Sequence, residues 1–167
     1  MANWAADTTS TFDFFKDAHD DLRTYLTTAG APDNFTTYFT NTLTIRRTVF
    51  PEPYEDDSKS NFPIAHIWPV TFEAFWTTAG ERAVKVTTRI MVWDEDNDPD
   101  VSGVSVKNLC GALASAIQQT RDTSGNTWAD TYCNHDQPVV DVSEISYQEE
   151  NQGLAQGQVN VTWSHKE

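Results

Sequence analysis

Basic residues are scarce in this chain of 167 residues, where 11 Lys and Arg stand against 25 Asp and Glu and the formal net charge is −14. Such a surface repels a phosphate backbone at ordinary ionic strength, where exposed charges still interact over about 8–10 Å. Nucleic acid is therefore not an expected ligand, and we expect protein or cation partners. Like charge in such excess destabilises a compact state unless ions screen it. Two hypotheses stay open: a protein that works at high salt, and an ordinary acidic protein.

Cysteine and long apolar segments are also scarce. The two cysteines, Cys110 and Cys133, form no CxxC pair, so no disulfide framework is indicated. Cys110 falls among apolar neighbours on a predicted helix, where small buried thiols are usual. No apolar run approaches the roughly 18 residues of a membrane span, and residues 1–10 lack the features of a signal peptide. We therefore expect no membrane partner and a protein that is made and kept inside a cell, or inside something assembled there.

Catalytic motifs are absent from the sequence. It contains no GxSxG, HExxH, GxxxxGK[ST] or GxGxxG pattern. The four histidines are scattered, and the one cluster of potential ligands, residues 133–136, lacks the second cluster that structural zinc requires. His66 lies in an apolar strand pattern, which favours a half-buried structural imidazole. We expect a protein that is not an enzyme and that holds no cofactor.

The acidic segment in the middle of the chain offers weak metal candidates, Asp94, Asp96 and Asp98, at the alternate positions of an EF-hand loop. The rest of that pattern fails, because Pro99 stands where glycine is required and Ser105 stands where a bidentate glutamate is required. The segment also follows a predicted strand rather than a helix. We interpret it as a solvated strand-to-helix loop.

Hydrophobic periodicity predicts one domain over residues 1–167. Helical spacing predicts amphipathic helices at 11–28 and 106–117, capped by Ser10 and Ser105. Alternation predicts strands, the last two less regular than the others, at 35–50, 64–75, 84–92, 139–147 and 158–163. Residues 128–133 form a possible short element, and 149–157 a link. The fold class is α+β: two main helices cover one face of a mostly antiparallel sheet of about five strands, in the order helix, three strands, helix, two strands.

Residues 64–76 carry aromatic side chains at both odd and even positions, so one face of a strand cannot hide them all. Either both faces are covered inside the monomer, or one face meets another subunit. Two helices are few for covering two faces, which favours a subunit interface. The candidates are Trp68, Phe72, Phe75 and Trp76, together with Tyr54 in the long polar loop 51–61, which is predicted to project.

The order of elements and several local patterns resemble the tail terminator proteins of tailed bacteriophages and tailed archaeal viruses, and the related neck and tail-completion proteins. The patterns that carry the resemblance span most of the chain: the helix 12–26, the strand and loop leading to Pro63-Ile64-Ala65-His66-Ile67-Trp68, the strand 82–93 with its polar turn into the helix 106–117, and the strand 158–163. That family is held together by topology more than by residue motifs, so no functional residue is transferred.

The resemblance implies a small α+β subunit of the virion, assembled in the host cytoplasm, without catalysis or cofactor. It implies a homo-oligomer, a hexameric ring that caps the tail tube, contacts the neck or connector, and lets DNA pass through its lumen. The acidic, lysine-poor composition further suggests a virus of a halophilic archaeon. Alternatives are another head–tail connector, a tail tube subunit, which the short predicted strands disfavour, and a small α+β enzyme or ligand-binding module.

Overall fold

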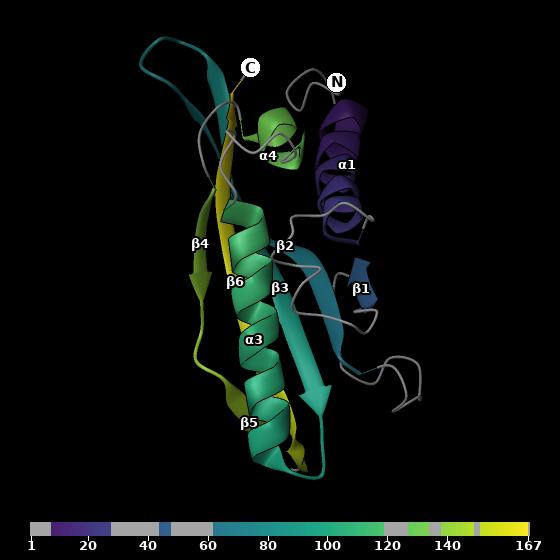
Figure 1. The fold of residues 1–167 in the computed structure, drawn as a ribbon. Helices are drawn as coiled ribbons and strands as arrows, with labels where there is room; N and C mark the ends of the chain where they lie inside the picture. Colours follow the sequence, from purple (N-terminus) through teal and green to yellow (C-terminus); the bar gives the residue numbers. More distant parts are fainter. Residues whose placement is uncertain are drawn as a thin grey trace.

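The computed structural model describes residues 8–27, 44–47, 62–118, 127–133, 138–148 and 151–166. Its elements, in chain order, are α1 (Thr8–Thr27), β1 (Thr44–Arg47), β2 (Ile64–Trp76), β3 (Arg82–Glu95), α3 (Pro99–Gln118), α4 (Thr127–Tyr132), β4 (Val139–Val142), β5 (Ser146–Gln148) and β6 (Asn151–Lys166). Figure 1 shows the helices on one side of the sheet. The fold is α+β in the predicted order.

The strands form one mixed sheet with the order β1-β2-β3-β6-β4, and β5 also pairs with β6. All pairs are antiparallel except β1 with β2, which is parallel over Ile64–Ile67 of β2. The predicted strand 35–50 is a strand at Thr44–Arg47, and its remaining residues lie outside the described part of the chain. This strand pairs with β2, the next strand along the chain.

The three central strands are longer than predicted, with 13 residues in β2, 14 in β3 and 16 in β6. The prediction of a link at 149–157 was wrong, because Asn151–Gly157 already belongs to β6. This segment is rich in Asn, Gln and Gly, which have low strand propensity, but it pairs along β3 and β5. The predicted strand 139–147 is two strands, interrupted at residues 143–145.

Both main helices begin earlier than predicted. Helix α1 starts at Thr8, so Ser10 lies inside it. Helix α3 starts at Pro99, where the fixed φ of proline suits the first helical position. Its N-cap is Asp98 rather than Ser105: the amide of Val101 donates to the Asp98 carbonyl at 3.1 Å, and Asp98 Oδ1 accepts from the Asp100 amide at 3.0 Å. The predicted acidic loop is therefore reduced to residues 96–98.

The main core lies between the helices and one face of the sheet. Helix α3 covers β3 and β6, and α1 lies over the β1–β2 side (Figure 1). Gly157 of β6 lets α3 come close, because a Cβ at this position would lie 2.8 Å from both Cys110 Sγ and Val106 Cγ1. The opposite face carries a smaller buried cluster at the end of the sheet where β2 begins, formed by Ile64, Met91, Trp93 and Leu154.

A hydrogen-bonded chain crosses the main core from α1 to β6. Trp163 Nε1 donates to Thr88 Oγ1 at 3.0 Å, and Thr88 Oγ1 lies 2.9 Å from His19 Nε2. His19 Nδ1 lies 2.7 Å from the Phe15 carbonyl oxygen, which can only accept. In the neutral imidazole Nδ1 is therefore the donor, and Nε2 accepts the Thr88 hydroxyl proton. One threonine thus joins α1, β3 and β6.

Helix α4 confirms the possible short element and packs against α1. Trp128 Nε1 donates to the Ala18 carbonyl at 2.8 Å, and the Tyr132 hydroxyl donates to Asp21 Oδ2 at 2.6 Å. Burial, together with the bond to Asp21, raises the pKa of Tyr132 well above its ordinary value, so the phenol stays neutral as a donor. Two polar groups of α1 are satisfied in this way.

The two cysteines and His66 are buried. Cys110 and Cys133 are both free thiols without solvent exposure, as expected for Cys110, and burial raises the pKa of the Cys110 thiol to about 12. His66 is fully buried beside Trp93, with ring centroids 5.3 Å apart, rather than half-buried as predicted, because the second face of the sheet is also covered there. Among the described helices, none is both long and apolar enough to cross a membrane.

Candidate interface on the projecting hairpin

The β2–β3 hairpin extends beyond the rest of the fold, at the top left of Figure 1. Strand β1 pairs only with Ile64–Ile67, so from Trp68 onward β2 has, among the described residues, no strand neighbour on the side away from β3. We call the arm this end of the sheet, residues 68–89 with residues 160–166 of β6. Burial changes at its base, because Ile64–Ile67 is buried and residues 69–76 are exposed.

The tip of the arm is an ordered turn. The Thr77 amide donates to the Glu81 carbonyl at 2.8 Å, and the Gly80 amide donates to the Thr77 carbonyl at 2.9 Å. Thr77 Oγ1 accepts from the Glu81 amide at 3.1 Å. Gly80 has a φ of 80°, a value that glycine adopts without steric cost. The turn therefore holds the ends of both strands in fixed positions.

A bulge in β2 explains the aromatic residues at both odd and even positions. The register between β2 and β3 shifts between Pro69 and Thr71, and directly opposed residues of an antiparallel pair lie on the same face. Phe72, opposite Val86, therefore lies on the face that the helices cover. Trp76 lies on that face too, and Trp68 and Phe75 lie on the other.

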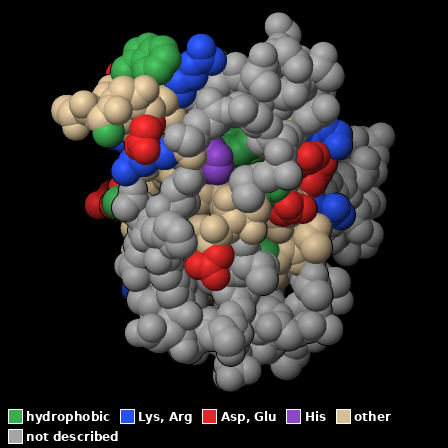
Figure 2. Space-filling view, turned by 90° about the horizontal axis from the view of Figure 1, so that it is seen from above, with side chains coloured by type: hydrophobic (Ala, Val, Ile, Leu, Met, Phe, Trp, Pro, Cys, Tyr) green, Lys and Arg blue, Asp and Glu red, His purple; other side chains and the backbone are tan. Residues whose placement is uncertain are grey.

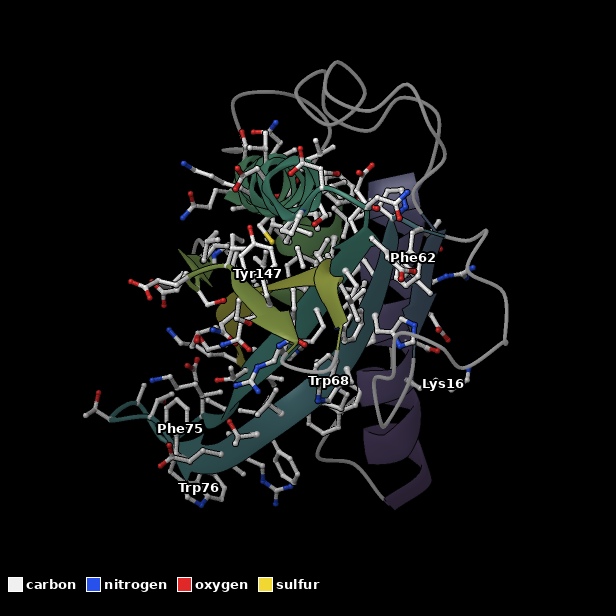
Figure 3. All side chains as sticks on the ribbon, turned by 90° about the horizontal axis from the view of Figure 1, so that it is seen from below. Lys16, Phe62, Trp68, Phe75, Trp76 and Tyr147 are labelled. Carbon is white, nitrogen blue, oxygen red and sulfur yellow. The ribbon has the colours of Figure 1, made fainter. Side chains whose placement is uncertain are left out.

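Large apolar side chains are exposed on both faces of the arm. Phe72 is 64% exposed and Trp76 is 66% exposed, and Phe75 is also exposed, whereas Trp68 is partly buried. Figure 3 shows Phe75 and Trp76 near the outer end of the hairpin and Trp68 closer to the body. The alternative of a strand covered on both faces therefore holds for the first residues of β2 and not for the arm. The remaining candidate, Tyr54, lies outside the described residues.

Contacts within the chain hold these aromatic rings in place. The Arg82 guanidinium lies 5.3 Å from the centre of the Trp76 ring, and that of Arg89 lies 5.9 Å from the Trp68 ring. Phe72 lies 5.3 Å from Phe15 of α1. Trp76 therefore has its ring contact within the arm, and Phe72 is tied to the body of the protein.

The charge of the arm differs from that of the chain. It holds four basic residues, Arg82, Lys85, Arg89 and Lys166, and only two acidic residues, Glu73 and Glu81, in a chain of net charge −14. Figure 2 looks down on this end and shows hydrophobic and basic side chains close together on the projecting corner at the upper left. Sequence reasoning missed this basic surface, because it averaged charge over the whole chain.

The weak metal candidates, Asp94, Asp96 and Asp98, accept hydrogen bonds from backbone amides. Asp94 Oδ1 accepts from the Glu95 amide at 2.9 Å, and Asp96 Oδ1 accepts from the Asp98 amide at 2.9 Å. Asp98 caps α3 as described above. Within the described part of the chain, no group of three or more His, Cys, Asp or Glu side chains is placed to hold a metal ion. These carboxylates shape the turn between β3 and α3.

No protein-family model matches the chain, and no curated protein matches it in sequence.

Proposed function

We propose that the protein is a structural subunit of a virion, a tail terminator that assembles as a ring on the tail tube and joins it to the neck. The observation that carries the proposal is the arm, an ordered hairpin that presents Phe72 and Trp76 about two thirds exposed. Exposed aromatic residues on an ordered element are typical of an interface with another protein. The order of elements supports the same family.

The size of the aromatic surface fits an interface that needs further contacts. Burying the exposed two thirds of Phe72 and Trp76 removes about 260 Å² of mainly apolar surface, which stabilises a complex by about 6 kcal/mol. Association costs about 4–15 kcal/mol before any affinity appears. The two rings therefore act as anchors, and the remainder of the arm supplies the rest of the contact.

The proposed assembly is a closed, hexameric ring. The arm lies at one end of the subunit, and a contact between unlike surfaces of identical subunits forms a ring when the rotation closes. In such a ring an acidic lumen lets DNA pass without binding it. The subunit is then located in the tail or neck of the virion, and the acidic composition suits a virus of a halophilic host.

The experiment that tests this proposal measures mass in solution by light scattering, at several salt concentrations. The wild type should form a ring of fixed mass, and Trp76→Ser should shift it to a monomer that is still folded, because Trp76 has its ring contact within the arm. Phe72→Ser should also weaken assembly, with a small loss of stability because its ring contacts Phe15. The matched control is Val139→Ser, which changes an apolar residue on β4 that is 59% exposed.

Two outcomes would contradict the proposal. A wild type that stays monomeric at every salt and protein concentration would exclude assembly of the free subunit. A Trp76→Ser variant that assembles like the wild type would show that the arm is not the interface between subunits. Loss of the folded monomer would instead place Trp76 in the core, against its exposure.

A tail tube subunit is the second candidate, and the length of the strands favours it. The sequence predicted short strands, which disfavoured a tube, whereas β2, β3 and β6 have 13 to 16 residues. The same mass measurement separates the two functions. A terminator stops at one ring, so its mass stays constant as protein concentration rises, and a tube subunit continues to grow.

Salt should stabilise the folded subunit. Screening shortens the range of charge repulsion from about 8–10 Å at ordinary ionic strength to about 3 Å in molar salt, which favours the compact state of a chain of charge −14. A gain of about 2 kcal/mol would raise the melting temperature by about 4–8 °C. Thermal unfolding of the Trp76→Ser variant in dilute and molar KCl measures this without assembly. An unchanged melting temperature would remove the high-salt hypothesis.

A further inference from the structure

A second surface lies at the end of the fold opposite to the arm. There β3 leads into α3, at the bottom of Figure 1, whereas the hairpin is at the top. Residues 94–104 contain five acidic residues and no basic residue. Val101 and Val104 of α3, which are three residues apart and so on neighbouring positions of the helix surface, are 52% and 59% exposed. We call this surface the acidic corner.

The acidic corner is rigid. Asp98 caps α3, and the Tyr147 hydroxyl donates to the Pro99 carbonyl at 2.9 Å. Gly103 makes room for that tyrosine, because any side chain at this position would collide with the hydroxyl. Figure 3 shows Tyr147 beside α3. Val101 and Val104 are therefore presented at fixed positions, beside acidic side chains.

We propose that the arm of one subunit docks on the acidic corner of a second copy of this chain. This inference rests on the proposed assembly through the arm and names the surface that receives it. Trp76 packs on Val101 and Val104, and Arg82, which lies against the Trp76 ring, meets the carboxylates of residues 94–100.

Charge decides between the possible pairings. Two arms would bring basic side chains together, and two acidic corners would bring five acidic residues against five. Only the pairing of arm with corner places opposite charges face to face, which selects the register and excludes the like pairings. The contact joins unlike surfaces at opposite ends of the subunit, so each copy in a ring uses both.

The experiment mixes two variants, each with one of the two surfaces disabled. Trp76→Ser removes the aromatic anchor of the arm. Val104→Lys disables the acidic corner, since it replaces an exposed apolar side chain with a cation that repels the basic arm. Each variant alone should be monomeric, with the dissociation constant of the contact raised about 30-fold or more. Their equimolar mixture should form a heterodimer and stop there, because one intact arm and one intact corner remain. Sedimentation velocity, at the salt concentration where the wild type assembles, measures these masses.

The experiment distinguishes failure of the docking on the acidic corner from failure of assembly through the arm. Gln118→Lys adds the same charge at the exposed far end of α3 and should assemble like the wild type. If Val104→Lys assembles normally, or if the mixture stays monomeric, the corner is not the partner of the arm, although the arm still carries assembly. If Trp76→Ser assembles normally, the proposed function fails as well. Val101→Lys should repeat the result, and replaces Val104→Lys if that variant does not fold.

Discussion

Thr88→Val should lower the free energy of unfolding by about 2–4 kcal/mol, a large part of the stability of a domain of this size. Valine has almost the same shape as threonine, so packing is conserved and only the hydroxyl is lost. That hydroxyl accepts the Trp163 Nε1–H and donates to His19 Nε2. Its removal leaves a buried indole N–H and a buried imidazole nitrogen without these bonds, each at a cost of about 1–3 kcal/mol. Urea unfolding monitored by tryptophan fluorescence measures the difference.

The matched control for this prediction is Thr87→Val, the neighbouring residue of β3. Thr87 lies opposite Thr71 on the other face of the sheet and is only partly buried. Valine has a high strand propensity, so this variant should stay within about 0.5 kcal/mol of the wild type. If Thr88→Val were as stable as Thr87→Val, the hydroxyl would not connect α1, β3 and β6.

Gly157→Ala should destabilise the fold by about 1–3 kcal/mol, because it overpacks the contact between α3 and β6. The added Cβ would lie 2.8 Å from Cys110 Sγ and Val106 Cγ1, and 2.9 Å from Ile145 Cδ1. These atoms come from the helix and from the segment between β4 and β5, so relief requires the helix to move away from the sheet. Thermal unfolding should show a lower melting temperature.

Gly111→Ala is the control for Gly157→Ala and should have the opposite sign. Gly111 is an exposed residue in the interior of α3, and a Cβ there meets nothing within 4 Å. Alanine loses less backbone freedom on folding than glycine, so the variant should gain about 0.5–1 kcal/mol. Equal effects of the two substitutions would show that α3 does not approach β6 through Gly157.

Periodicity was sufficient to predict most elements and their order, and failed where contacts between elements set the bounds. The start of α3 was placed at Ser105, because Gly103 and the acidic residues read as a loop. In the fold Gly103 makes room for Tyr147, and Asp98 caps the helix. The first half of β6 was missed for a related reason, since Gly157 is a poor strand former that the packing of α3 requires.

The candidate interface was partly predictable. Aromatic residues at both odd and even positions of 64–76 indicated a strand with two apolar faces, and the bulge between Pro69 and Thr71 now accounts for their distribution. The projection of the hairpin was not predictable, because it depends on where β1 stops pairing with β2. The basic character of the arm was also missed, because Lys166 joins Lys85 and Arg82 only through strand pairing.

Beyond Ile67, no strand in the described part of the chain pairs with the outer edge of β2, and this has a consequence for the isolated subunit. A long strand edge that carries aromatic residues is a template for aggregation, and newly made subunits would stack edge to edge. Three features of this edge oppose stacking: Pro69 lacks an N–H to donate, the adjoining bulge increases the local twist, and Glu73 places an exposed charge between Phe72 and Phe75. The edge of the arm thus discourages fibril growth although its aromatic faces are exposed.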